Sequence, residues 1–169
     1  IRLSLVGSEM CIRDSTLMTP FFNPGKADFG LPKIYLAGVG PVMTQVAGEV
    51  ADGLMVHPFH TAQSMKNITL PSVKKGNLNS LNDGFEISVG VMIASSNDQD
   101  SLDQAINGLR SQIAFYGSTP AYKIVLEQHG WEHIHVELNR LSKKGSWNDM
   151  PTLISDEILE TVGIVGNAE

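Results

Sequence analysis

The chain has 169 residues, a formal net charge of −6 and 42% hydrophobic residues, which suits one globular domain with a core of its own. The acidic balance and the lack of a basic run argue against nucleic acid as a partner. No apolar run approaches the roughly 18–20 residues of a membrane span, which argues against a membrane partner. The single cysteine, Cys11, excludes an intrachain disulfide and fits a cytoplasmic protein.

Residues 1–15, IRLSLVGSEMCIRDS, differ in character from the rest of the chain. The apolar run Leu3–Val6 is too short for a signal-peptide core. The string VGSEMCIRDS resembles the translated read-through of a sequencing adapter more than a protein motif. We therefore expect residues 1–15 to be foreign to the domain, and residues 16–169 to hold a partial domain that is truncated at both ends. The alternative for the first segment is a short edge strand.

The stretch from Pro32 to His60 predicts a strand, a glycine loop, a helix and a second strand. The helix is expected to end near Gly53, because glycine suits a left-handed helix cap. Leu54–Val56 then predicts a short strand buried on both faces, as in a parallel sheet. His57 and His60 follow the carboxyl end of that strand, where α/β proteins place their chemistry.

A glycine loop, GVGP at residues 38–41, joins the first strand to the helix. Its glycines let the backbone approach a ligand closely, and its proline suits the first turn of a helix. The free N–H groups of a helix start favour an anion such as phosphate. A dinucleotide fingerprint would need a third glycine where Met43 stands and an acidic residue where His57 stands. The pattern therefore favours a phosphate-binding loop of another kind, with a plain tight turn as the alternative.

The rest of the chain alternates between strand and helix patterns. A helix is expected over residues 61–75, with a kink at Pro71. A strand over residues 85–94 and another over residues 161–165 enclose a long segment with helical apolar stripes. Such alternation predicts an α/β fold with a parallel sheet, and with an inserted helical group before the last strand.

Two groups of histidines are candidate site residues. His57 and His60 favour contact with a substrate, and solvated loop histidines are the alternative. A metal site is not expected there, because no cysteine or paired carboxylate accompanies them. His129, His133 and His135 do not match the H-E-x-x-H pattern and are expected to lie on the surface.

Three stretches of the chain carry a resemblance to a known family. IYLAGVGPVMTQVAGEVADGLMVHPFH, RSQIAFYGSTPAY and LEQHGWEHIHVELNRLSKKGSW resemble the bacterial luciferase-like family, and specifically its branch of coenzyme F420-dependent oxidoreductases. The resemblance runs from about Leu17 to Gly166. It implies an α/β fold that is the C-terminal half of a (β/α)8 TIM barrel. It also implies hydride transfer or monooxygenation of a small-molecule substrate with coenzyme F420 or FMN.

The same resemblance implies roles for individual residues. The cofactor-binding loop would be the backbone at Gly38, Val39, Gly40 and Val42, and the substrate contacts would be His57 and His60. Sugar-phosphate-oxidising relatives carry a hydroxyl and a lysine at the two histidine positions, so phosphosugar specificity is not expected. The catalytic acid and base of the family belong to its N-terminal half, so the catalytic residues are unknown from this chain.

The resemblance also bears on the behaviour of the chain by itself. Without the family's catalytic pair, the isolated chain is expected to be inactive, and unpaired strand edges would favour aggregation or a homo-oligomer. Two other functions stay open. One is a non-catalytic flavin-binding relative, and the other is a Rossmann-like nucleotide-binding domain, which would show the strand order 3-2-1-4 in an open sheet.

Overall fold

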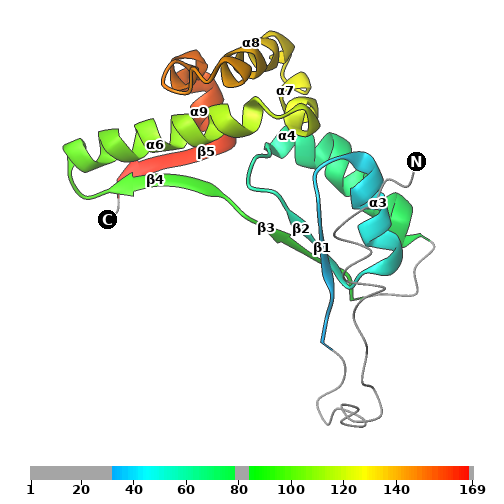
Figure 1. The fold of residues 1–169 in the computed structure, drawn as a ribbon. Coiled ribbons are helices and arrows are strands. Elements are labelled where there is room, and N and C mark those ends of the chain that lie inside the picture. Colours follow the sequence, from blue (N-terminus) through cyan, green and yellow to red (C-terminus); the bar gives the residue numbers. More distant parts are fainter. Residues whose placement is uncertain (1–31, 79–83, 168–169) are drawn as a thin grey trace, which may run out of the picture. The chain divides into compact units, whose positions relative to one another are not determined.

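The computed structural model describes residues 32–78 and 84–167 (Figure 1). The described residues from Lys33 onward form one compact unit. The predicted foreign segment, residues 1–15, lies outside the described residues. The strands are β1 (Tyr35–Gly38), β2 (Gly53–Val56), β3 (Glu86–Val89), β4 (Met92–Ser96) and β5 (Gly163–Asn167).

Helices separate most of these strands along the chain. The first group is α3 (Pro41–Val50), α4 (Ala62–Ser64), the π-helical η1 (Met65–Thr69) and α5 (Leu70–Asn77). The second group lies between β4 and β5 and consists of α6 (Gln99–Gly117), η2 (Pro120–Tyr122), α7 (Lys123–Glu127), α8 (Glu132–Lys144), η3 (Met150–Leu153) and α9 (Asp156–Val162). Helices therefore occupy the segment between β4 and β5. The helix expected over residues 61–75 is present as α4, η1 and α5, and a π-helical turn precedes Pro71.

All strand pairs of the described residues are parallel, in a sheet of order β1-β2-β3 and a second sheet of β4 and β5. The single strand expected over residues 85–94 is therefore wrong, because the chain leaves the first sheet at Gly90 and joins the second at Met92. A Cβ at Gly90 would lie 3.1 Å from Pro58 Cγ, so the backbone bends where it passes this proline. The last strand pairs with β4, whereas the order 3-2-1-4 would place a fourth strand beside β1. The strand order therefore argues against the Rossmann alternative.

The first sheet is covered by α3 and α5 on one face. Leu54 and Val56 of β2 are buried there, together with Ala47 of α3 and Val73 of α5. Met55 points to the opposite face and is 53% exposed. The prediction of a strand buried on both faces is thus wrong, because no described segment covers the side of the sheet to which Met55 belongs.

Gly53 has a different role from the predicted one. α3 ends at Val50, and Gly53 is the first residue of β2 with no positive φ. A Cβ at Gly53 would lie 2.4 Å from Cε1 of Tyr35, its register partner in β1. The glycine therefore makes room for a neighbouring ring instead of capping the helix. A left-handed glycine does end α8, at Gly145 with φ of 73°.

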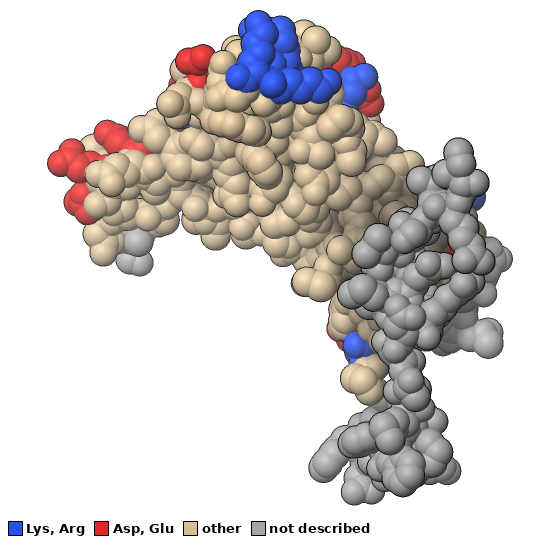
Figure 2. Space-filling model, in the orientation of Figure 1, with Lys and Arg blue, Asp and Glu red and all other residues tan. Residues whose placement is uncertain are grey.

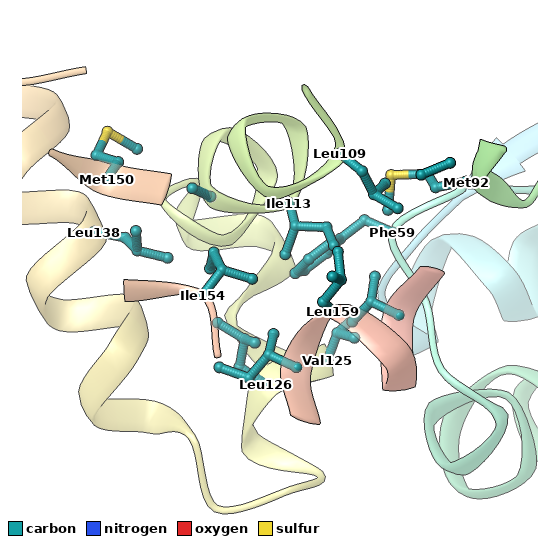
Figure 3. Close-up of a cluster of buried hydrophobic side chains, with 14 of the residues drawn as sticks. Phe59, Met92, Leu109, Ile113, Val125, Leu126, Leu138, Met150, Ile154 and Leu159 are labelled. Atoms are coloured by element: carbon teal, nitrogen blue, oxygen red, sulfur yellow. The ribbon is translucent and has the colours of Figure 1, made fainter. Parts of the chain in front are cut away.

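The larger core lies between the second sheet and the helices that connect its two strands (Figure 3). Met92 of β4, Leu109 and Ile113 of α6 and Leu138 of α8 are buried in it. Phe59, which follows β2, also belongs to this core and is 1% exposed. In Figure 3 its ring points toward Ile113. Phe59 therefore fixes the segment that carries the two candidate histidines against the helical group.

Charged residues complement the helix dipoles at two helix ends. Asp98 caps α6, where its side chain accepts a hydrogen bond from the N–H of Ser101 at 2.9 Å. Lys143 and Lys144 lie in the last turn of α8. Figure 2 shows acidic atoms at the start of α6 and basic atoms over α8, the arrangement that the dipole of each helix favours. Among the described helices, none is both long and apolar enough for a membrane span.

Candidate functional site

A pocket of about 520 Å³ lies at the carboxyl ends of β1 and β2. Its walls come from the β1–α3 loop, the end of β2, the segment after β2 and the η2 helix. The lining residues carry no charged side chain apart from the titratable imidazole of His57: Ala37, Gly38, Val39, Gly40, Met43, Met55, Val56, His57, Pro58, Ala121 and Tyr122. The pocket thus combines a largely apolar wall with a single histidine.

The start of α3 offers backbone donors at the pocket. Gly40 is the N-cap, no side chain caps the helix, and Pro41 occupies the first turn. The N–H of Thr44 donates to the carbonyl oxygen of Gly40 at 3.1 Å, which is the first bond of the helix. The N–H groups of Val42 and Met43 therefore have no acceptor within the helix. Such groups, with the positive end of the helix dipole, favour an anion.

The two glycines of the loop differ in what surrounds them. A Cβ at Gly38 would lie 3.3 Å from Leu54 Cδ1 and from Thr44 Oγ1, so Gly38 is needed for close packing between β1, β2 and α3. A Cβ at Gly40 would have nothing within 4 Å. The backbone of Gly40, with φ of −86° and ψ of 163°, is also open to any residue. Packing within the described chain therefore gives no reason for glycine at position 40, whereas close approach of a ligand would.

The structure brings most of the predicted site residues together. Gly38, Val39, Gly40 and His57 line the pocket. His60 lines a smaller adjoining cavity, in which Gly38, Val39 and His57 also take part. Val42 is 72% exposed and does not line either cavity, so only its backbone N–H at the helix start could serve the predicted role.

His57 is held by contacts on several sides. Its ring stacks on Tyr122 with a centroid distance of 4.6 Å and an interplanar angle of 25°. Tyr116 of α6 meets it edge to face, also at 4.6 Å. The N–H of Phe59 donates to His57 Nδ1 at 3.1 Å. Burial, and next the proximity of His60, lowers the pKa of His57 below its ordinary value of 6.5.

The two histidines carry their ring protons on different nitrogens. Because Nδ1 of His57 accepts from the N–H of Phe59, the neutral ring holds its proton on Nε2. Nδ1 of His60 lies 3.1 Å from the carbonyl oxygen of His57, which can only accept, so this nitrogen of His60 donates. A neutral His60 therefore has an accepting Nε2. His57 therefore presents a donor, its Nε2–H, and the neighbouring neutral His60 presents an acceptor, its Nε2.

Three residues at the site were not predicted as site residues: Tyr116, Ala121 and Tyr122. Tyr116 lies in the last turn of α6 and Tyr122 ends η2, and both are distant along the chain from His57. The signal that could have found them is the aromatic pair that brackets the Ser118–Pro120 turn, directly after an amphipathic helix. Their contact with His57 depends on how the helical group packs on Phe59, which local patterns do not reveal.

The second histidine group has mixed roles, so the prediction of three surface histidines is only partly right. His133 is exposed. His135 is buried, and its Nδ1–H donates to the carbonyl oxygen of Gly117 at 2.8 Å. His129 is partly buried, with Nε2 2.9 Å from Thr61 Oγ1 and its ring stacked on Trp131. Over the described ranges, no group of three histidine, cysteine or acidic residues could hold a metal ion.

Comparisons with known proteins agree on one family. An uncharacterized protein of Mycobacterium tuberculosis is 42% identical over 95% of this chain and 49% of its own length. The 5,10-methylenetetrahydromethanopterin reductase of Archaeoglobus fulgidus is 31% identical over 88% of this chain and 46% of its own length. The chain therefore spans about half the length of the curated relatives that it matches.

A solved structure shares the fold. The coenzyme F420-dependent tetrahydromethanopterin reductase of Methanopyrus kandleri superposes with a TM-score of 0.64 and 22% identity, over 80% of this chain and 38% of that structure. The fold is thus an α/β fold similar to that of an F420-dependent reductase. The sequence profile of the luciferase-like monooxygenases matches residues 13–169. The chain therefore belongs to the luciferase-like monooxygenase family.

Proposed function

We propose that this chain is part of an oxidoreductase that uses coenzyme F420 or a flavin, and that its pocket holds part of the cofactor beside the substrate. The observation that carries the proposal is the open side of Gly40. A glycine that packing does not require stands at an uncapped helix start, in the same pocket as His57. Family membership supports an oxidoreductase-type role for this pocket.

The residues fit such a cofactor. F420 and FMN both join a planar ring system to a phosphate-bearing tail. The free N–H groups of Val42 and Met43 suit the anionic part. The apolar wall that includes Met55, Val56 and Pro58 suits a ring surface. The similar solved structure is that of a coenzyme F420-dependent reductase, which makes F420 the preferred cofactor of the proposal.

The chain's own residues would bind and orient, while the bound cofactor would supply the hydride chemistry. The start of α3 would hold the anionic tail in place. His57 would donate from Nε2–H to an acceptor on the substrate, and His60 would accept through Nε2 or contact the substrate from the adjoining cavity. We propose that the catalytic acid and base lie outside this chain, so that the isolated chain shows no turnover and binding is the useful readout.

Titration of the 169-residue chain with F420 and with FMN, followed by cofactor fluorescence, tests the proposal. Gly40→Leu should weaken binding at least about tenfold, because the leucine side chain enters space that the protein leaves open. Gly108→Leu is the matched control. A Cβ at Gly108 also meets nothing within 4 Å, but this glycine lies on the exposed side of α6. Equal cofactor affinity in the wild type and Gly40→Leu would contradict the proposed loop.

A further inference from the structure

The contacts of His57 leave one ring nitrogen for a ligand. Nδ1 is occupied by the N–H of Phe59. Over the described residues, His57 Nε2 has no hydrogen-bond partner. It is not one of the fully buried polar atoms without a partner, so it is accessible. The ring lines the main pocket. The Nε2–H is therefore free to donate to whatever enters that pocket.

Two tyrosines determine the plane of the ring. Tyr122 lies against one face, and the edge contact of Tyr116, at an interplanar angle of 87°, closes a second side. The rings of Tyr116 and Tyr122 also contact each other, with centroids 5.9 Å apart. Both tyrosines lie about 6.1 Å from the ring of Phe59, which is fixed in the core. The aromatic cage of Tyr116, Tyr122 and Phe59 thus limits rotation of the imidazole about its own side-chain bonds.

We propose that Tyr116 and Tyr122 are positioning residues that hold His57 with its Nε2–H toward the pocket, as a hydrogen-bond donor to an uncharged or anionic acceptor on the ligand. The role of His57 as a ligand contact rests on the proposed function, whereas the positioning by the tyrosines does not. A donor that cannot accept would reject a cationic group, which can only donate. The pocket should therefore prefer a carbonyl-type oxygen to an ammonium group of the same size.

The surrounding charges agree with this geometry. The titratable groups that face His57 are His60 on its own segment, Tyr116 on α6 and Tyr122 on η2. No carboxylate among the pocket residues would favour a charged imidazole. The lowered pKa of His57, caused first by burial, keeps the ring neutral near pH 7. The neutral ring is the form in which Nδ1 can accept from Phe59.

Long-range proton–nitrogen NMR of the full chain, with histidines labelled with ¹⁵N and no cofactor added, tests the positioning. A His57→Gln variant identifies the His57 signals. In the wild type, the nitrogen shifts should report the Nε2–H form. Tyr122→Leu keeps an apolar side chain at this position but removes the ring, so it should give mixed ring forms of His57 and a higher titration midpoint. Tyr122→Phe keeps the stacked ring and should behave like the wild type.

The proposal is overturned if Tyr122→Leu leaves both the ring form and the midpoint of His57 unchanged, or if Tyr122→Phe alters them as much as Tyr122→Leu. The preferred ligand class is tested with propionamide and propylammonium, two small probes of similar size. Only the amide should shift the His57 Nε2 signal in a saturable way, and an equal or larger shift with the ammonium probe contradicts that preference. These readouts use no cofactor, so they can succeed where F420 and FMN titrations fail, or the reverse.

Discussion

At the scale of single residues, Gly53 provides a direct test of packing between strands. A Cβ at this position would lie 2.4 Å from Tyr35 Cε1 and 2.7 Å from the carbonyl oxygen of Glu86. The ring of Tyr35 cannot simply withdraw, because its hydroxyl donates to the Glu86 carboxylate, which Lys33 also contacts. We expect Gly53→Ala to lower the free energy of unfolding by about 1–3 kcal/mol.

Urea denaturation of both proteins measures this loss. Gly40→Ala is the matched control, because its new methyl group meets nothing within 4 Å, and it should change the free energy of unfolding by less than about 0.5 kcal/mol. If the two alanine variants prove equally stable, the close approach of Tyr35 to β2 is not a constraint on this sheet.

His57 predicts a pH dependence of stability. Burial, followed by the effect of His60, lowers its pKa in the folded chain below the ordinary 6.5. Between that lowered pKa and 6.5, the unfolded chain binds more protons than the folded chain, so stability rises with pH in this window. The contribution is present above pH 6.5 and is lost as the pH falls toward the folded pKa.

Thermal unfolding midpoints measured from pH 5 to pH 8 test this dependence. His57→Gln should flatten the curve in the window just below pH 6.5, because the variant has no group there to protonate. His133→Gln changes an exposed histidine and should leave the curve as in the wild type. A curve that keeps its slope in His57→Gln would show that other groups cause the dependence.

At the scale of elements, a glycine that follows a helix and a glycine inside a helix should respond to alanine with opposite changes in stability. Gly145 follows α8 with φ of 73°, and an added Cβ would meet no atom within 4 Å, so only backbone strain opposes alanine. Gly145→Ala should cost about 1 kcal/mol of stability. Gly108 lies inside α6 with equally open surroundings, and Gly108→Ala should add about 0.5–1 kcal/mol.

Guanidinium denaturation of the two variants beside the wild type measures both changes. Because neither methyl group touches other atoms, contacts cannot account for a difference in sign. A stabilised Gly145→Ala would mean that the left-handed conformation does not end α8 in solution, and a destabilised Gly108→Ala would mean that position 108 is not an open site within the α6 helix.

Local patterns predicted the elements well where a single physical rule dominates. Asp98 caps α6 and Gly145 ends α8, and residue types of this kind indicate a helix end from the sequence, since capping depends on neighbouring residues alone. The prediction of Gly53 as a helix cap was wrong, because the position requires glycine to make room for the Tyr35 ring on another strand. The break at Gly90 and the α9 helix, which Ser155 caps, also escaped the sequence patterns. Contacts between distant segments determine these features.

At the scale of the whole described chain, the same distinction holds for the site. The loop at Gly40 and the histidines at the end of β2 follow from the strand–loop–helix pattern, and the structure places Gly40 and His57 in one pocket. The wall formed by Tyr122 could not be predicted, because it requires the helical group to pack against Phe59. Tertiary packing therefore contributes the part of the site that orients His57.

Exposed apolar side chains on the strands predict how the chain behaves in solution. Ile93 of β4 and Ile164 of β5 are register partners, and they are 59% and 54% exposed. Met55 of β2 is also exposed. Exposed apolar side chains on strands favour association with other strands or apolar surfaces. We therefore expect the 169-residue chain to self-associate as its concentration rises.

Sedimentation velocity over a range of concentrations tests self-association. The double variant Ile93→Thr with Ile164→Thr keeps β-branched residues in both strands but removes apolar surface, so it should shift the distribution toward monomer. Val50→Thr with Val136→Thr is the matched control, because these valines are 72% and 62% exposed but lie on α3 and α8. Strictly monomeric wild type, or an equal effect of the control, would rule out the strand face as the cause. A shift caused only by the strand variants would locate association at the face to which Ile93 and Ile164 belong.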